Sequence, residues 1–166
     1  MEIVDKFDNK REPLNKTSKR KDKINGEYRQ SAHIWIVNDE GKFLMQKRSK
    51  YKKKFVGKCS QTGGAVDEGE TPLQGALREC KEELGLDISK EEIELIFSFK
   101  RKYDFVDVWL VKKNIDIGKL KLQEEEVEAV KWVTKEEIEE MIRTNKTTPN
   151  VSFYFDILLK LIKEYC

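Results

Sequence analysis

Short apolar stretches rich in β-branched and aromatic residues recur along the chain, and several of them alternate with polar residues. This pattern predicts β-strands. The predicted strands are residues 31–37, 42–46, 93–100, 105–112 and 127–133. The turn at residues 38–41 joins the first two strands into a predicted hairpin. A further alternating run over residues 2–7, followed by a turn at residues 8–10, predicts a hairpin or an extended arm at the N-terminus.

A helix is predicted between residues 71 and 86. Thr71 suits the N-cap, Pro72 the first helical position, and Gly85 the left-handed position that ends a helix. At 100° per residue, the apolar side chains of this segment share one face. These side chains are Leu73, Ala76, Leu77, Cys80 and Leu84.

Two more helices are predicted near the C-terminus. Thr134 and Glu137 have the spacing of a capping box that opens a helix to about residue 143. Asn150 is a candidate cap of a last helix, in which apolar residues recur at helical spacing as a core or docking face. They are Phe153, Ile157, Leu158, Leu161 and Ile162. Helices that alternate with a largely antiparallel sheet predict a mixed α/β (α+β) fold.

Length and composition narrow the class of protein. The 166 residues suit one domain, with residues 1–28 as an N-terminal arm and residues 31–166 as its core. Lys and Arg total 33 against 31 Asp and Glu, so the net charge of +2 gives no reason to expect a nucleic-acid partner. No apolar run is long enough to span a membrane, and the charged N-terminus does not resemble a signal peptide. Cys59, Cys80 and Cys166 have no metal-binding spacing, which suggests free thiols in a reducing cytoplasm.

Three carboxylates lie together on the predicted 71–86 helix. Glu79, Glu82 and Glu83 fall opposite its apolar face, within about one turn. They repel one another unless a cation lies among them, and oxygen ligands on a rigid helix suit Mg²⁺ or Mn²⁺. The same pattern on an ordinary surface helix is usually a solvated acidic face, so the spacing of the surrounding residues decides between the two.

The stretch from Gly64 to Leu86, GAVDEGETPLQGALRECKEELGL, resembles the signature box of the Nudix hydrolase family. Every fixed polar or glycine position of that box is present. The one departure is Cys80, where the family usually has Ile, Leu or Val, and this change to another small apolar side chain is mild. The resemblance implies a central, mostly antiparallel mixed sheet between helices, with the helix of the box packed against one side.

The resemblance also implies the metal ligands. Glu82 and Glu83 would be the main ligands of Mg²⁺ or Mn²⁺, and the carbonyl oxygen of Gly63 a further ligand. Glu79 would be either a ligand or the general base that activates water, since the family varies on this point. The implied reaction is attack of water at a phosphorus atom of a diphosphate.

Other implied site residues support these ligands. Arg78 would hold a carboxylate of the box in place through a forked hydrogen bond, and Glu70, with Gly64, would support the turn. Many members of the family also use an acidic residue from a distant loop. Residues 124–126 are the best candidates for that role, and Glu126 is the predicted one.

Residues 47–58 contain seven basic residues in twelve positions. This loop is either simply solvated or a positive rim that draws a diphosphate toward the metal, with Arg48 and Lys58 as candidate substrate-binding residues. It is too short to predict a nucleic-acid surface.

Outside the box, residues 46–49, the basic loop and the N-terminal arm resemble the branch that contains type 1 isopentenyl-diphosphate isomerases. That enzyme uses a Cys closely followed by a His, and a metal site with several histidines. Here residues 60–65 contain neither, and the only histidine, His33, is interpreted as a strand residue with a structural hydrogen bond. A Mg²⁺-dependent hydrolase that cleaves a nucleoside diphosphate linked to another moiety is therefore favoured. The isomerase and a non-catalytic binding module are the alternatives.

The substrate is not defined by the box. Five aromatic residues could stack on a base, although each is better explained as part of the core or sheet surface. They are Trp35, Trp109, Tyr51, Tyr103 and Phe105. A small-molecule diphosphate is the expected partner, and the N-terminal arm could pair with a second subunit to form a homodimer.

Overall fold

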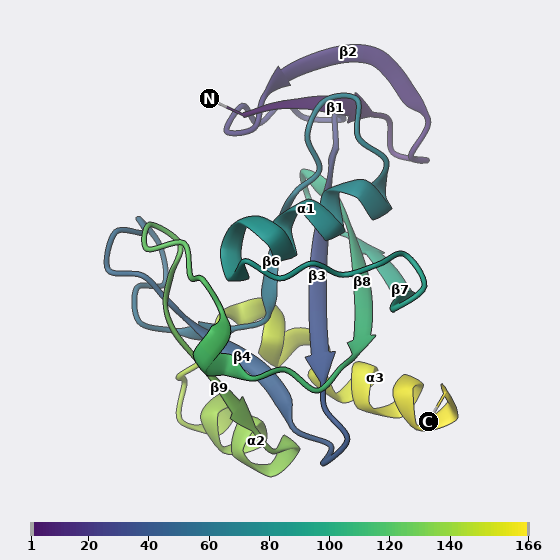
Figure 1. Ribbon diagram of the computed structural model, residues 1–166. Helices are drawn as coiled ribbons and strands as arrows, with labels where there is room; N and C mark the ends of the chain where they lie inside the picture. The colour runs from purple at the N-terminus through teal and green to yellow at the C-terminus, as the bar shows by residue number, and fades with distance from the viewer. Residues whose placement is uncertain (1, 166) are drawn as a thin grey trace.

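The computed structural model describes residues 2–165 as a mixed α+β fold with a central sheet and three helices (Figure 1). Cys166, one of the three predicted free thiols, lies outside the described residues. The strands are β1 (Ile3–Phe7), β2 (Pro13–Lys19), β3 (Arg29–Val37), β4 (Phe43–Arg48), β5 (Cys59–Ser60), β6 (Thr62–Ala65), β7 (Ile93–Lys100), β8 (Asp104–Lys112) and β9 (Val127–Val133). The helices are α1 (Pro72–Leu84), α2 (Lys135–Arg143), α3 (Pro149–Tyr165) and the short 3₁₀-helix η1 (Ile117–Lys119).

Strand β3 lies at the centre of the main sheet. It pairs in parallel with β8, from Arg29 opposite Asp104 to Val37 opposite Lys112, and antiparallel with β6. The strand order is β5-β4-β3-β8-β7, and β9 pairs with β4. Among the described strands, β3 and β8 form the one parallel pair, so the sheet is mixed and mostly antiparallel.

The predicted hairpin between β3 and β4 forms only at its turn. The Asn38 N–H donates to the Lys42 carbonyl over 3.0 Å, and Val37 pairs with Phe43, but the strands then separate. Strand β6 takes the place beside β3, while β4 pairs with β5 and β9. The predicted hairpin is confirmed at its turn, and beyond the turn the later strands β5, β6 and β9 pair with the backbone groups of β3 and β4. This separation opens the sheet where the candidate site lies.

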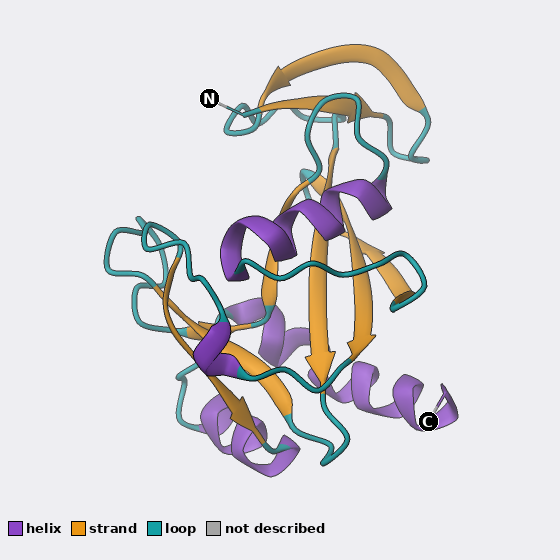
Figure 2. Ribbon diagram, in the orientation of Figure 1, coloured by secondary structure: helices purple, strands orange, loops and turns teal. Residues whose placement is uncertain are grey.

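Helices cover the two faces of the sheet (Figure 2). Alternate residues of β3 point to opposite faces, as the period of a strand requires. Ala32, Ile34 and Ile36 pack in the core cluster under α1, whereas Trp35 packs against α3 with Tyr154. The site-bearing helix α1 is therefore fixed directly on the central strand.

The last helix departs from its predicted start and face. It begins at Pro149, so Asn150 lies inside its first turn instead of preceding it. Phe153 and Ile157, predicted to belong to a core or docking face, are exposed, and Val151, Tyr154 and Phe155 are buried in addition to Leu158 and Ile162. Nearly every position of this helix that is not charged is apolar, so periodicity alone could not select the buried face.

The N-terminal arm is a two-stranded hairpin of β1 and β2, placed beside the loop that precedes α1 (Figure 1). The N–H groups of Glu68 and Gly69 donate to the Ile3 carbonyl over 2.8 Å and to the Asp5 carboxylate over 2.9 Å. Phe7 forms a further bridge with Tyr28, just before β3. The hairpin is thus tied to the loop that leads into α1.

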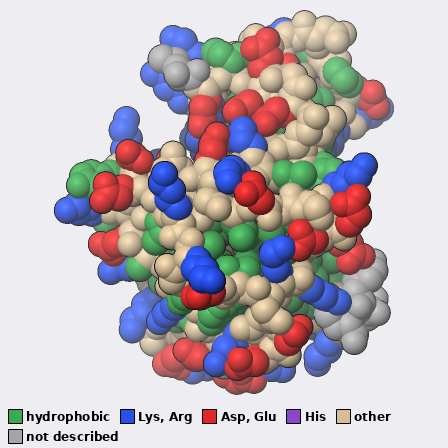
Figure 3. Space-filling model, viewed as in Figure 1, with side chains coloured by type: hydrophobic (Ala, Val, Ile, Leu, Met, Phe, Trp, Pro, Cys, Tyr) green, Lys and Arg blue, Asp and Glu red, His purple; other side chains and the backbone are tan. Residues whose placement is uncertain are grey.

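Acidic and basic side chains are interspersed over the face shown in Figure 3. Within the described residues, no helix has the length and apolar character needed to cross a membrane.

Candidate active site

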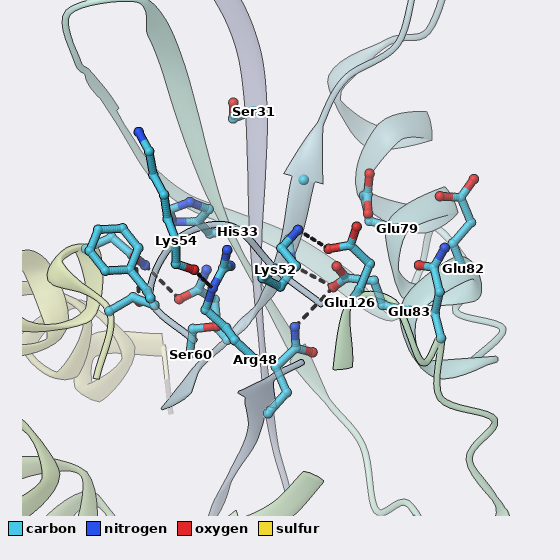
Figure 4. Close-up of a pocket in the computed structure, with 18 of the residues that line it drawn as sticks. Ser31, His33, Arg48, Lys52, Lys54, Ser60, Glu79, Glu82, Glu83 and Glu126 are labelled. Carbon is cyan, nitrogen blue, oxygen red and sulfur yellow. Dashed lines mark hydrogen bonds and ion pairs between the residues drawn. The ribbon is translucent and has the colours of Figure 1, made fainter. Parts of the chain in front are cut away.

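A cavity of about 410 Å³ opens where β3 and β4 separate (Figure 4). Its lining comes from β3, β4, β5, β6, α1, the start of α3, the basic loop, the β7–β8 turn, the segment before β9 and the N-terminal arm. The carboxylates of Glu79, Glu82, Glu83 and Glu126 line one side, which we call the acidic wall. The structure thus brings together the three box glutamates and the predicted distal acid.

Local signals fix α1 at this wall. Thr71 Oγ1 accepts from the Gln74 N–H over 3.2 Å while the Gln74 side chain accepts from the Thr71 N–H, which completes a capping box. At the other end Gly85, at φ 66°, donates its N–H to the Lys81 carbonyl. These caps were predicted from sequence and are confirmed. They hold the glutamates on a rigid element.

The glutamates differ in exposure. Glu79 and Glu83 are buried, whereas the Glu82 side chain is 46% exposed. Positions 79 and 83 are one turn apart and point toward the sheet, so they share the cavity side of the helix. Glu82 lies at the outer margin.

Arg78 binds several groups at once. Its Nε and Nη2 donate to both oxygens of Glu70 over 2.8 and 3.0 Å, and Nη2 also donates to the Ala65 carbonyl. Its Nη1 donates to Glu79 over 3.0 Å and to Glu82 over 3.1 Å. The guanidinium therefore joins the turn before α1 to two carboxylates of the acidic wall, and its own pKa is raised because these carboxylates outweigh the effect of its burial.

Glu83 has only neutral hydrogen-bond donors. Its Oε1 accepts from the Gly63 N–H over 3.2 Å and from Gln46 Nε2 over 3.3 Å. Gln46 is oriented by Thr62, whose hydroxyl donates to the Gln46 amide oxygen over 3.0 Å. Among residues 2–163, Glu83 forms no ion pair within 4 Å. A buried carboxylate without a cation is costly.

The pKa values reflect this cost. Burial raises the pKa of Glu79 to about 8, and the nearby charge of Glu83 adds to the effect. Burial likewise raises the pKa of Glu83 to about 7, although the Gly63 and Gln46 donors partly compensate. Both carboxylates would be stabilised as anions by a cation placed between them.

Two glycines let the carboxylates approach the backbone. A Cβ on Gly64 would lie 2.3 Å from the Glu79 carboxylate, and a Cβ on Gly63 would lie 2.5 Å from the Ala32 carbonyl. Larger residues at either position would displace a carboxylate or the β3–β6 pairing. This crowding explains in physical terms why glycines precede the helix.

The donor set fits a hard divalent cation. Two buried carboxylates, a third at the margin, and the backbone of Gly63 offer oxygen ligands only. Within the part of the chain that the structure describes, no three His, Cys, Asp or Glu side chains already converge as a metal cluster. Arg78 Nη1 occupies one oxygen of Glu79 and one oxygen of Glu82.

The basic loop contributes Arg48, Lys52 and Lys54 to the cavity. Arg48 Nε donates to the Lys54 carbonyl over 3.1 Å, which folds the loop back on itself. Lys52 forms an ion pair with Glu126 that connects the loop to the acidic wall (Figure 4). Lys58, a predicted substrate-binding residue, instead donates to the Asn145 carbonyl and does not line the cavity.

Sequence reasoning missed three arginines of this cavity. Arg20 follows β2, Arg29 begins β3, and Arg101 lies in the turn between β7 and β8. They are far apart in sequence and belong to no motif. One signal could have found two of them. Arg29 begins β3 and Arg101 shortly precedes β8, and because these strands pair in parallel, both residues lie at the same edge of the sheet.

The five aromatic residues considered as stacking candidates do not line the cavity, in agreement with their interpretation as core or sheet residues. Trp35 and Trp109 are buried, and none of the five candidate stacking residues lines it. Phe55, on the basic loop, is the one Phe, Tyr or Trp among the described residues that does, and it is 46% exposed. His33 lines the cavity but its Nδ1 is bonded to the Tyr154 hydroxyl at 2.9 Å, which confirms a structural hydrogen bond, and burial lowers its pKa to about 3.

Comparison with known proteins points to one family. The model of the NUDIX domain matches residues 27–155. An uncharacterized Nudix hydrolase of Listeria innocua is 36% identical over 164 residues, which cover 97% of this chain and 95% of that protein. A Deinococcus radiodurans crystal structure has the same fold, with a TM-score of 0.74 at 20% identity over 89% of this chain and 92% of that one. An Ap4A hydrolase of C. elegans, solved as a binary complex, has a TM-score of 0.55 at 25% identity over 80% of this chain and 98% of that one.

Proposed function

The chain belongs to the Nudix hydrolase family, and we propose that it cleaves, with Mg²⁺ or Mn²⁺, the diphosphate bond of a nucleoside diphosphate linked to another moiety. Water attacks one phosphorus atom, a new P–O bond forms, and the bond to the bridging oxygen breaks. The products are two phosphate-bearing fragments, and the proton of water passes to a base. The observation that carries the proposal is the buried pair Glu79 and Glu83, which faces the cavity with too few cations to balance it.

The acidic wall provides the proposed metal ligands. They are Glu79, Glu82, Glu83 and the carbonyl oxygen of Gly63. A divalent cation bound there would neutralise phosphate oxygens and favour ionisation of water. Gln46 and the Gly63 N–H hold Glu83 in position, and Arg78 holds Glu79 and Glu82. Arg78 is thereby a positioning residue, supported by Glu70.

Two residues are candidates for the base. Glu79 is buried beside the cavity with a raised pKa, and Glu126 reaches the same wall from the segment before β9. Because Lys52 already pairs with Glu126, we favour Glu79 as ligand or base and Glu126 as a group that orients water or metal.

The substrate diphosphate would lie between the acidic wall and the basic loop. Arg48 and Lys52 line the cavity on that loop and supply the charge to hold a diphosphate. Phe55 lies on the same loop and offers an exposed ring against which a base could stack. Arg48 thus remains a proposed substrate-binding residue, whereas Lys58 is oriented elsewhere.

The isomerase alternative is less well supported. Among the described residues, no cysteine lines the cavity, and Ser60 and Gln61 occupy the segment where that enzyme would place its cysteine and histidine. The half-buried Cys59 lies outside the lining, and burial raises the pKa of its thiol. A non-catalytic binding module would not require the buried carboxylate pair.

The test is a panel of diphosphates with purified protein and Mg²⁺ or Mn²⁺, containing nucleoside di- and triphosphates, nucleotide sugars, dinucleoside polyphosphates and isopentenyl diphosphate. We expect metal-dependent cleavage of a nucleotide linked to another moiety, lowered by at least about 10²-fold in Glu83→Gln. The matched control is Glu139→Gln, on the exposed side of α2. Conversion of isopentenyl diphosphate to its isomer without any cleavage would contradict the proposal, and absence of any turnover would favour the binding module.

A further inference from the structure

The end of the cavity lined by Arg20, Arg29 and Arg101 carries more positive charge than its own carboxylates balance. We call it the arginine end. Its three residues come from the N-terminal arm, the start of β3 and the β7–β8 turn. The match to the family model begins at residue 27, so Arg20 reaches the cavity from a segment outside that match.

Only two carboxylates compensate the three guanidinium groups there. Asp104 is buried and accepts from Arg101 Nε over 2.8 Å and from Nη2 over 2.6 Å, while Arg29 Nη1 lies 3.6 Å from it. Glu2 accepts from Arg20 over 2.8 Å. The Ser31 hydroxyl also donates to Asp104, over 2.8 Å. Three guanidinium groups and two carboxylates leave one positive charge in excess. The guanidinium groups also have N–H donors that do not point at Asp104 or Glu2.

The guanidinium groups are near enough to repel one another. Burial lowers the pKa of Arg29, and the charges of Arg20 and Arg101 lower it further, so that Asp104 does not fully compensate. Arg20 is also near enough to the acidic wall to interact with its charges. Burial lowers the pKa of Arg20, but the charge and the hydrogen bond of Glu2 raise it. The charges of Glu79 and Glu126 raise it further, so the pKa of Arg20 is raised overall. A ligand could therefore contact the acidic wall through a metal and the arginine end directly.

Figure 4 shows where Ser31, a hydrogen-bond partner of Arg29, lies relative to the acidic wall and the basic loop. Ser31, which accepts from Arg29 over 2.8 Å, lies at one end of the view, Arg48 and Ser60 lie toward the other, and Glu79 lies to the side. A diphosphate held between Arg48 and the glutamates would leave one of its substituents pointing toward Ser31 and the arginine end.

We propose that the arginine end binds an anionic group, phosphate or carboxylate, on the moiety that is joined to the nucleoside diphosphate. The inference rests on the proposed function of the same cavity and names the class of that moiety. The arginines could instead serve only to attach the N-terminal hairpin to the domain. In that case their replacement would change stability but not the choice between substrates.

The experiment compares pairs of substrates that differ in one remote charge. UDP-glucuronate and UDP-glucose differ by a carboxylate on the sugar, and ADP-ribose 1″-phosphate and ADP-ribose differ by a phosphate on the terminal ribose. We expect kcat/KM to favour the charged member of at least one pair by about tenfold, since a charge-assisted hydrogen bond contributes that much discrimination. Preference in only one pair would identify phosphate or carboxylate as the group.

Two substitutions of surface residues separate binding from attachment. Arg20→Gln should reduce the preference to near parity, with the uncharged substrate affected less than about twofold, whereas Glu2→Gln should increase the preference because it frees Arg20. Both residues are more than two-fifths exposed, so folding should persist. Arg143→Gln on α2, which removes an equal charge outside the cavity, should leave the preference unchanged.

The inference is overturned if both members of each pair are cleaved equally by the wild type, or if Arg20→Gln and Glu2→Gln change only stability. If the wild type cleaves none of them, the proposed function is judged on the wider panel of diphosphates, and calorimetric binding of the same pairs in EDTA tests the anion site by itself. Tighter binding of a charged member, lost in Arg20→Gln, would still support the anion site. Equal or undetectable binding would overturn it.

Discussion

The acidic wall and the arginine end of one cavity are built in opposite ways. Three of the four carboxylates of the acidic wall come from a single helix of 13 residues, α1, held by caps at both ends. The arginine end is assembled from three segments that are distant in sequence, one of them in the N-terminal arm. Chemistry that needs fixed geometry is thus encoded locally, while the surface proposed to select the substrate depends on tertiary structure.

The two regions also carry charges of opposite sign, and in neither region is the charge fully balanced by nearby groups. Glu83 has neutral donors only, and three arginines share Asp104 and Glu2. A ligand with a bound cation at one end and an anionic group at the other would neutralise both. Substitutions that alter one region at a time test this difference.

The largest effect is expected at Arg78, which holds the acidic wall together. Arg78→Gln removes the hydrogen bonds to Glu70, Glu79 and Glu82, so kcat should fall by about 10²-fold, the size of effect that residues supporting metal ligands have. Steady-state kinetics with circular dichroism would check it. Lys81→Gln, an exposed change on the same helix, is the control. Turnover of Arg78→Gln within about twofold of wild type would show that the wall does not need this support.

A smaller effect is expected from crowding Glu79. The Cβ of Gly64→Ala would meet the Glu79 carboxylate, and the displacement should lower kcat at least about tenfold. Gly41→Ala is the matched control, because Gly41 has φ 76° but open space around it. That variant should lose on the order of 1 kcal/mol of stability without losing activity. Equal kinetics in the two variants would exclude a role for the close approach.

The stability of the metal-free protein should depend on pH through the acidic wall. The pKa values of Glu79 and Glu83 are raised to about 8 and about 7, so the folded state binds these protons more tightly than the unfolded state. Their contribution is complete at low pH and is lost as the pH rises through these values. Urea unfolding in EDTA at several pH values measures it. In the double variant Glu79→Gln/Glu83→Gln this pH dependence should be absent, and its persistence would assign it to other groups.

The smallest effect concerns His33, which lies in the cavity but belongs to neither region. Burial lowers its pKa to about 3, so the folded state resists protonation and its contribution to stability is lost as the pH falls below 6.5. NMR of this single imidazole should show no titration between about pH 7.5 and 5. A titration midpoint near 6.5 would mean that His33 adds a switchable charge to the cavity.

The same contrast explains what the sequence could predict. The caps of α1, its glutamates and the five strands predicted after residue 30 follow from local spacing, and the structure has them where they were expected, whereas β2, β5 and β6 were not predicted. Local patterns do not show which strand pairs best with β3 or β4, and so they could not predict that these two strands separate. Nor do they show which face of α3 packs best against the sheet. Arg20 is the clearest case, since its place in the cavity depends on where the N-terminal hairpin attaches. The homodimer and the cytoplasmic location stay predictions from sequence.

The most direct test is to measure the affinity of the wild type and of Glu83→Gln for Mn²⁺ without substrate, by electron paramagnetic resonance or calorimetry. The account predicts that Mn²⁺ binds the wild type and that Glu83→Gln weakens the affinity at least about tenfold, while Glu139→Gln leaves it unchanged. Equal Mn²⁺ affinity in the wild type and Glu83→Gln would contradict the assignment of the acidic wall as the metal site.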